Sequence, residues 1–294
     1  MDKQEVKKAV ILVAGFGTRF LPVTKAQPKE MLPLVDKPIV QYLVEEARDA
    51  GLKEIVLVTG KNKRAIEDHF DRAPELEAFL EARGKKDLAD SVRDISSLAF
   101  FAYVRQKEQL GMVDAILQAR PLIGEEPFAL LTGDDIIDEK PSVLTHLIRV
   151  YKEYGAPVVA LHRVPAKDAH RYGIIAGKEV SPRVWRLTGS VEKPAHGTAP
   201  SDLMIVAKYI LTPDFLPYLA DEKNALNGEV YIPPAIASYI RAGGAFYGYE
   251  AEGEYYDCGD KLGYIKAVVN FALRHPEIGP GIREYLEQKF GNPG

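Results

Sequence analysis

Three features of the 294-residue sequence predict an α/β fold with a mixed sheet. Short runs at residues 9–13, 54–59 and 127–132 each contain at least four consecutive apolar residues, as fully buried strands do. Segments with apolar side chains at helical spacing lie between these runs. Residues 171–212 instead alternate apolar and polar side chains, which indicates strands with one exposed face. We therefore expect a parallel, Rossmann-like core with right-handed crossovers and a mixed or antiparallel extension.

The first half of the chain supplies the core. Asp36 and Pro38 are expected to form the N-cap and the first turn of a helix that ends at Gly51. A buried strand at 54–59 and another helix follow. Residues 71–96 are highly charged, with both signs and only a thin apolar stripe, so we expect a helical excursion on the surface.

The second half continues the alternation and then departs from it. We expect a single domain over residues 1–294, with a core at 7–165, a second portion at 166–260 and C-terminal helices at 261–294. The expected elements, in order, are a strand at 99–104, a helix opening at 110–112, a strand at 127–132, a helix over 144–151 and a strand at 158–161. The strands of 171–212 follow, then helices near 214–220 and 231–242, a strand at 246–249, a helix from 261 and a last helix at 279–290.

Composition and charge exclude several classes of protein. Hydrophobic content of 46% and charged content of 27% are ordinary for a soluble globular protein. A net charge of −4 leaves no basic surplus for binding a nucleic acid. With one cysteine, Cys258, no internal disulfide is possible, and we expect a small buried thiol in a reducing, cytoplasmic setting. No apolar run approaches the roughly 20 residues of a membrane helix, and no signal-peptide pattern is present.

The first candidate site is the loop that follows the first strand. Residues 14–19 read Ala-Gly-Phe-Gly-Thr-Arg, so Gly15 and Gly17 allow backbone N–H groups to approach a ligand closely. Thr18 adds a hydroxyl, and Arg19 adds a planar fork for phosphate oxygens. Lys29 follows as a second cation. A plain tight turn would explain the glycines but not these cations, so a phosphate-binding loop is the favoured interpretation.

Two familiar nucleotide motifs do not fit this loop. A dinucleotide-binding GxGxxG would need glycine where Phe20 stands, and Asp36 sits at an expected helix start rather than at the end of a second strand. This disfavours a nicotinamide-dependent oxidoreductase. No GxxxxGK[ST] sequence occurs, so a P-loop is also absent. The loop is therefore a nucleotide cradle of another kind.

A second candidate site consists of two aspartates. Asp134 and Asp257 each follow an apolar or aromatic strand and precede an expected helix. If both project into one crevice they would suit Mg²⁺, which binds one or two carboxylates plus substrate phosphates. Each aspartate could instead cap a helix. Asp135 and Asp260 are better placed for capping, which leaves both interpretations of Asp134 and Asp257 open.

Taken together, these residues resemble the sugar-phosphate nucleotidyltransferases, which couple a nucleoside triphosphate to a sugar 1-phosphate. The similarity spans Lys8 to about Gly279. Residues 14–42, AGFGTRFLPVTKAQPKEMLPLVDKPIVQY, are similar to the uridylyltransferase branch almost residue for residue. The charged excursion at 71–96 also resembles that branch. The resemblance implies the Rossmann-like nucleotidyltransferase fold with a sugar-binding β extension.

The resemblance also implies a role for each matching residue. Arg19 and Lys29 would grip the triphosphate, and Lys193 the phosphate of the sugar. Asp134 and Asp257 would hold Mg²⁺. Sugar contacts are implied at Gly173, Glu192 and Asp202, and contacts to the nucleotide at Ala14, Gly15, Gly17, Thr18, Glu30, Gln106 and Gly111.

The implied reaction is transfer of a uridylyl group from UTP to glucose 1-phosphate, giving UDP-glucose and pyrophosphate. Alternatives are a related enzyme that uses dTTP or another sugar 1-phosphate, and a non-catalytic sugar-nucleotide sensor. The sugar is the least secure part because relatives usually carry Asn where Asp202 stands, Gly where Ala207 stands, and a Thr-Asp pair within the segment that reads Gly-Glu-Val-Tyr-Ile-Pro-Pro at 228–234. A homodimer or homotetramer is implied, with 71–96 and the last helix as candidate contact surfaces, and no nucleic-acid or membrane partner.

Overall fold

The computed structural model describes residues 4–221, 225–226 and 229–291, and these contain a nine-stranded mixed sheet. Its first half is parallel and runs in the order β5 (Phe100–Arg105), β4 (Glu54–Thr59), β1 (Lys8–Leu12) and β6 (Phe128–Thr132). The predicted parallel core is confirmed. Because these strands are parallel, the loops after β1, β4, β5 and β6 all leave the same edge of the sheet.

The second half of the sheet is the predicted mixed extension, and it is continuous with the core. β11 (Leu203–Leu211) runs antiparallel to both β6 and β8 (Val158–Arg163). β14 (Tyr247–Glu250) is parallel to β8, and β10 (Val184–Glu192) and β9 (Gly173–Ser181) complete the order. The extension curls far enough for Ile174 of β9 to pair with Met204 of β11.

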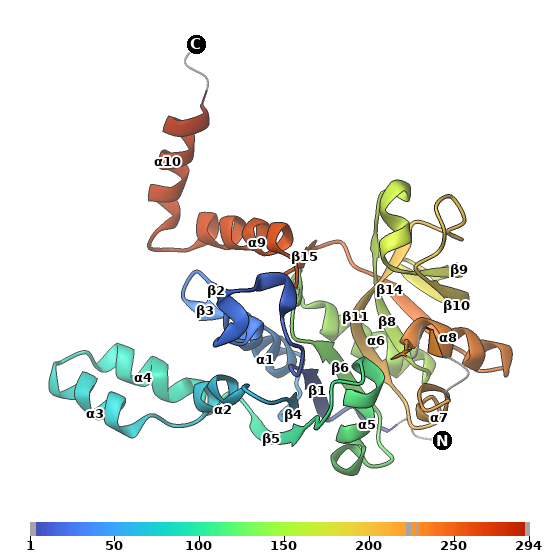
Figure 1. Cartoon of the computed structure of the whole chain (residues 1–294), viewed down its shortest axis with the longest axis horizontal. Coiled ribbons are helices and arrows are strands. Elements are labelled where there is room, and N and C mark those ends of the chain that lie inside the picture. The colour runs from blue at the N-terminus through green and yellow to red at the C-terminus, as the bar shows by residue number, and fades with distance from the viewer. Residues whose placement is uncertain (1–3, 222–224, 227–228, 292–294) are drawn as a thin grey trace.

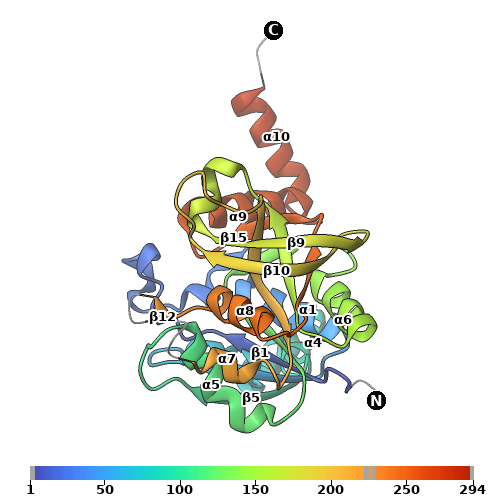
Figure 2. The same ribbon diagram turned by 90° about the vertical axis from the view of Figure 1, so that its right-hand side faces the viewer.

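Helices cover both faces of the sheet (Figures 1 and 2). Alternate residues of β1 face opposite sides, with Ala9 and Ile11 in one core cluster and Val10 in the other. The first face carries α1 (Ile39–Asp49), α2 (Arg64–Phe70) and α6 (Val143–Tyr154). The second carries α5 (Met112–Ile123), α7 (Leu216–Leu219) and α8 (Ile232–Arg241).

Small two-stranded ladders correct two expectations about aspartates. Asp36 is not a helix cap, because it lies in the turn between β2 (Pro33–Leu34) and β3 (Lys37–Pro38), and α1 begins after Pro38. Asp135 does not cap a helix either. It begins β7 (Asp135–Asp138), which pairs antiparallel with β15 (Glu254–Asp257). The remaining short ladder joins β12 (Ala225–Leu226) to β13 (Glu229–Val230).

The expected capping role of Asp260 is confirmed. Its side chain accepts hydrogen bonds from the backbone N–H groups of Leu262 (2.8 Å) and Gly263 (3.1 Å) at the start of α9 (Lys261–Arg274). Four short 3₁₀ segments, η1 (Thr18–Phe20), η2 (Val23–Lys25), η3 (Lys29–Met31) and η4 (Ala166–Arg171), lie in loops within the described ranges.

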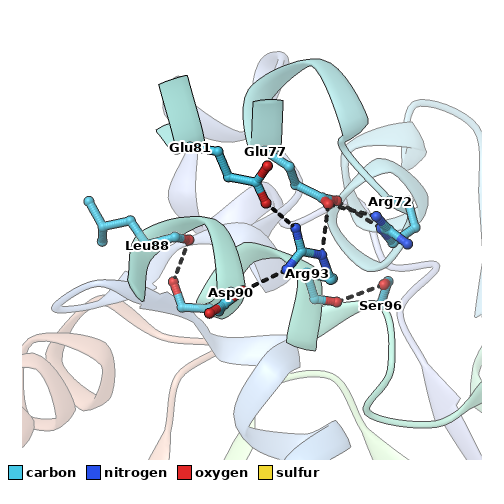
Figure 3. Close-up of polar contacts among 8 residues, drawn as sticks. Arg72, Glu77, Glu81, Leu88, Asp90, Arg93 and Ser96 are labelled. Atoms are coloured by element: carbon cyan, nitrogen blue, oxygen red, sulfur yellow. Dashed lines mark hydrogen bonds and ion pairs between the residues drawn. The ribbon is translucent and has the colours of Figure 1, made fainter. Parts of the chain in front are cut away.

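Two helical elements project from the body (Figure 1). The predicted excursion forms α3 (Pro74–Ala82) and α4 (Lys86–Ile95), and the last helix, α10 (Gly279–Phe290), leads away beyond α9. The charges of the excursion join its two helices, as Figure 3 shows: Glu77 accepts hydrogen bonds from Arg72 (2.8 and 2.6 Å) and Arg93 (3.1 Å). Arg93 also donates to Glu81 at 2.7 Å. The excursion has only a thin apolar stripe, and these ion pairs help to hold its two helices together.

Within the described part of the chain, every helix is too short or too polar to span a bilayer.

Candidate active site

The loop after β1 is folded tightly against Lys29. Gly17 adopts a left-handed backbone conformation (φ 67°) before η1, and Thr24 donates a hydrogen bond from its hydroxyl to the Gly17 carbonyl at 2.8 Å. A Cβ atom at Gly17 would lie only 3.2 Å from the Lys29 Cβ. The glycine is thus required by both the turn and the close approach.

A cavity of about 560 Å³ lies beside this loop and collects most of the predicted nucleotide contacts. It lies where the loops after β1, β5 and β6 meet, which is the usual ligand position in an α/β sheet. Predicted residues in its wall are Ala14, Gly15, Lys29, Glu30, Gln106, Gly111 and Asp134. Thr18 instead lines an adjoining cavity of about 370 Å³ that Lys25, Lys61 and Lys63 share. Gly17 lines neither of these two cavities and acts through the turn.

The two candidate metal ligands are brought together although they are distant in sequence. The β7–β15 ladder pairs Asp257 with Asp135, and the Cys258 N–H donates to the Asp134 carbonyl at 2.8 Å. A Cβ at Gly259 would lie 2.9 Å from both Asp257 Oδ1 and Arg19 Nη2, and closer still to Asp134 Oδ2. Only glycine leaves this convergence of two carboxylates and a guanidinium unobstructed. Cys258 itself is fully buried, as expected.

Charges in this cluster are partly desolvated. Burial raises the pKa of the Asp257 carboxyl, and the neighbouring Asp134 raises it further, while Arg19, 3.5 Å away, opposes the shift. Lys29 donates a hydrogen bond to Asp134. Burial by itself lowers the pKa of Lys29, but Asp134 and Glu30 outweigh it, so the pKa is raised. Two carboxylates that repel each other in a small space fit a bound divalent cation, which would favour both ionised forms.

Glu30 lies in the cavity wall but is almost entirely covered. Its side chain is 1% exposed, and Oε2 accepts a hydrogen bond from Lys63 Nζ at 2.7 Å. Burial raises the pKa of Glu30 and lowers that of Lys63, as expected for ions removed from water. Among the described residues, none hydrogen-bonds the other oxygen, Oε1. Sequence reasoning missed Lys63, which looks like one of several surface lysines.

The part of the cavity wall that follows β5 is polar, and no lysine or arginine lines it among the described residues. Gln106 is 5% exposed and donates from Nε2 to the Gly111 carbonyl (3.0 Å) and to Asp114 Oδ2 (2.7 Å). Gln109 donates to the Ala14 carbonyl. Neither Asp114 nor Gln109 was predicted, and only their closeness to Gln106 in sequence hinted at a role.

The predicted sugar contacts form a second group. Gly173 and Glu192 are paired in the β9–β10 ladder, and a Cβ at Gly173 would lie 3.1 Å from Glu192 Oε2. Lys193 follows in a left-handed conformation (φ 45°), with its Nζ 3.3 Å from Glu192 Oε1. The same Nζ lies 5.3 Å from the centre of the Tyr231 ring. A Cβ at Gly173 would also overlap the Pro233 ring.

Two of the sequence departures are therefore in contact with this group. Tyr231 and Pro233 touch Lys193 and Gly173, respectively. Asp202 has a partner of its own, because Arg163 Nη1 contacts both of its carboxylate oxygens at 2.9 Å. Ala207 lies where the β11–β8 register shifts, between Val206 and Tyr209. Gly228 lies outside the described residues.

The chain is similar to known proteins along nearly its whole length. The family model described as nucleotidyl transferase matches residues 8–272. Over 285 residues the chain is 47% identical to a protein of Staphylococcus saprophyticus named UTP–glucose-1-phosphate uridylyltransferase 2, covering 97% of the chain and 98% of the relative.

Solved structures give the same result. A UTP-bound UGPase from Acinetobacter baumannii is 36% identical with a TM-score of 0.88, over 96% of this chain and 98% of that one. A UDP-glucose pyrophosphorylase complexed with UDP-glucose is 40% identical with a TM-score of 0.82, over 92% and 100%. The chain therefore has a cation-rich loop, converging carboxylates and a polar cavity, and it is similar to these proteins over nearly its full length. It belongs to the nucleotidyl transferase family.

Proposed function

We propose that this protein transfers a uridylyl group from UTP to glucose 1-phosphate, forming UDP-glucose and releasing pyrophosphate. The observation that carries the proposal is the 560 Å³ cavity, whose wall combines the cation Lys29 and the carboxylate of Asp134 with the neutral polar groups of Gln106 and Gly111. This polarity matches a nucleoside triphosphate, whose base is neutral and whose phosphates are anionic. The names of the relatives support the choice of UTP and of UDP-glucose as product.

The residues divide into three binding roles. Ala14, Gly15, Gln106 and Gly111 hold the base and ribose, with Gly17 and Thr18 shaping the loop beside them. Arg19 and Lys29 grip the triphosphate. Gly173 and Glu192 bind sugar hydroxyls, and Lys193 binds the phosphate of the sugar. This division assigns nucleotide binding to residues 7–165, sugar binding to 166–260 and a supporting role to the helices of 261–294.

Two predicted roles change in light of the contacts. Glu30 is bonded to Lys63 and is too covered to be a main ribose contact, so we assign it to supporting Lys29 from within the wall. Asp202 is engaged by Arg163 through both oxygens, so we remove it from the sugar contacts.

Catalysis requires positioning and charge neutralisation rather than a covalent nucleophile. An oxygen of the sugar phosphate, held by Lys193, attacks the α-phosphorus in line while pyrophosphate leaves on the opposite side. Arg19 and Lys29 neutralise the charge that accumulates on the phosphate oxygens. Asp134 and Asp257 would hold Mg²⁺, which supplies further neutralisation of these oxygens when it is bound.

The test is a matrix of four nucleoside triphosphates against several sugar 1-phosphates, read as pyrophosphate release with and without Mg²⁺. We expect the highest kcat/KM for UTP with glucose 1-phosphate, and release only with the metal. Highest activity with dTTP or with another sugar 1-phosphate would show a related nucleotidyltransferase with a different substrate. Another sugar 1-phosphate is the second candidate, because Tyr231 and Pro233, which lie in a segment that departs from relatives, contact the proposed sugar-binding residues Lys193 and Gly173. No release in any combination would favour a sensor and refute the proposal.

The homodimer or homotetramer implied by the resemblance stays a prediction. The two projecting elements carry exposed apolar side chains, Phe79 and Leu88 on α3 and α4 and Tyr285 and Phe290 on α10. Light scattering coupled to size-exclusion chromatography measures the oligomeric state directly. A monomer at micromolar concentration would contradict the prediction.

A further inference from the structure

The inference concerns Gln106, whose side chain closes the uncharged end of the cavity. Gln106 follows β5 directly, and its backbone N–H donates to the Thr59 carbonyl at the end of β4, at 2.8 Å. The residue is therefore fixed to the sheet rather than carried on a free loop. With 5% of its surface exposed, its amide meets only the cavity and the protein around it.

The orientation of this amide is determined by its partners. The amide nitrogen lies 3.0 Å from the Gly111 carbonyl oxygen and 2.7 Å from Asp114 Oδ2. A carbonyl and an ionised carboxylate can only accept hydrogen bonds, so both require the NH₂ group. The flipped amide would place its oxygen against two other oxygens. The usual ambiguity between the oxygen and nitrogen of a glutamine is thus removed by chemistry.

The amide oxygen is consequently the group left for a ligand. Within the described ranges, no residue donates a hydrogen bond to Gln106 Oε1, and the atom is not sealed away from the cavity as the covered Oε1 of Glu30 is. The cavity end therefore presents an acceptor. Uracil and thymine carry a donor at ring N3, whereas the N3 of cytosine is an acceptor.

We propose that Asp114 is a positioning residue for base selection, because it holds the Gln106 amide so that its oxygen accepts from N3–H of uracil or thymine and opposes cytosine. The proposal rests on the proposed function, since it requires the base of the nucleotide to occupy this end of the cavity. Asp114 acts through Gln106 and does not itself touch the base.

The placement of Asp114 suits this task. It lies in the first turn of α5, where the helix dipole favours a negative charge. Its second oxygen, Oδ1, accepts from Gln118 Nε2 at 3.2 Å, one turn further along the helix. The carboxylate is thus held from two sides, by Gln118 on its own helix and by Gln106 across the cavity wall.

The experiment compares Asp114→Leu with Asp114→Asn, which keeps an oxygen acceptor. Asp87→Leu is the matched control, because Asp87 also lies in the first turn of a helix, α4, but is exposed on the projecting arm. The readouts are kcat/KM for UTP and for CTP with glucose 1-phosphate, and the dissociation constants of UTP and CTP measured by calorimetry without the sugar.

We expect the wild type to prefer UTP to CTP by at least about 100-fold, since a site built around one hydrogen-bonding pattern rejects the analogue that lacks it. Asp114→Leu should lower this ratio by about 10-fold, Asp114→Asn by less than about 3-fold, and Asp87→Leu not at all. In a Gln106→Leu background, Asp114→Leu should change the ratio no further, because the two residues act as one unit.

An unchanged UTP-to-CTP ratio in Asp114→Leu would overturn the proposal and leave Asp114 a helix-stabilising residue. So would an equal loss in Asp114→Asn. If Asp114→Leu does not fold, Asp114→Ala takes its place in the same comparison. Failure of the proposed function would appear separately, as a wild type that releases no pyrophosphate, and the binding ratios would still decide the role of Asp114.

Discussion

The buried ion pair between Lys63 and Glu30 gives the sharpest test of how the cavity wall is held together. The pair joins the turn after β4 to η3, which carries Lys29, and its side chains are 6% and 1% exposed. We consider the substitution Lys63→Met, which keeps an unbranched side chain only one atom shorter and removes its charge. Glu30 would then keep a buried negative charge without its hydrogen-bonded partner.

The size of the effect follows from desolvation. Breaking a buried pair by removing one partner costs about 3–5 kcal/mol, because the remaining charge is uncompensated. Both pKa shifts agree that burial opposes these charges, since the pKa of Glu30 is raised and that of Lys63 is lowered. In a chain of this length the loss corresponds to a fall in Tm on the order of 6 °C or more. Replacing both residues, Glu30→Met with Lys63→Met, should recover most of it.

Thermal unfolding and urea titration of the three proteins measure these differences. The control is Lys61→Met, because Lys61 is an exposed lysine two residues away and should change the free energy of unfolding by less than about 0.5 kcal/mol. Two results would refute the reasoning. One is a Lys63→Met protein as stable as the control, and the other is a double variant that is no more stable than Lys63→Met.

Three further predictions follow from the contacts. Arg19→Ala and Lys29→Ala should each lower kcat by at least about 100-fold, as the loss of one preorganised charge contact does, while circular dichroism stays unchanged; near-normal turnover in either folded variant would count against the phosphate roles. Tyr231→Leu removes the ring beside Lys193 and should raise the KM for the sugar 1-phosphate by about 3-fold or more, with little effect on the KM for UTP. Tyr231→Phe keeps the ring and should stay close to wild type. Equal effects of both variants would exclude the cation–π contact. The pKa of Glu77 is lowered to about 2, chiefly by the hydrogen bonds from Arg72, so its stabilisation of the α3–α4 arm is present above its ordinary pKa of 4.5 and is lost as the pH falls toward 2; hydrogen exchange over residues 74–95 should show this loss in the wild type and no such pH dependence in Glu77→Gln.

Much of the fold follows from local patterns in the sequence. The continuous apolar runs that become β1, β4 and β6 can only be buried strands, and parallel connection then brings their following loops to one edge. This reasoning is enough to group Gly15 with Asp134. The helical pattern at the end of the chain likewise predicts α10, whose bounds at Gly279 and Phe290 match the expected helix.

Capping was predicted correctly at Asp260 and wrongly at Asp36 and Asp135, and the physical reason is the same in each case. An aspartate before a helix-like segment satisfies backbone N–H groups only if the chain turns directly into the helix. At Asp36 and Asp135 short ladders intervene, and such ladders depend on a distant partner: β7 forms because β15 arrives beside it. Nothing local to residue 135 reports that partner.

Lys63 and Asp114 could not be predicted for a related reason. Charged residues in a turn and at a helix start are ordinarily solvated, and only the folded chain shows that one is buried against Glu30 and the other aimed at Gln106. The same holds for Asp202, whose engagement by Arg163 depends on the pairing of β8 with β11. Interactions across elements decide these three roles.

The residues that bind the nucleotide in the proposed assignment were easier to predict than those near the sugar, and the fold explains this difference. Arg19, Lys29 and Asp134 follow the neighbouring strands β1 and β6, so the strand order brings them to one edge of the sheet, and the β7–β15 ladder adds Asp257. The sugar end is assembled from the turn after β10, the start of β9 and the start of α8, where Lys193 holds a left-handed conformation and Pro233 packs on Gly173. β9 and β10 share a strand edge, but α8 meets them through the side chains of Tyr231 and Pro233. A change such as that at Tyr231 can therefore reshape the proposed sugar group without disturbing the phosphate group. In the proposed assignment, the core sheet therefore constrains the reaction, whereas the choice of sugar depends on contacts that can vary independently of the sheet.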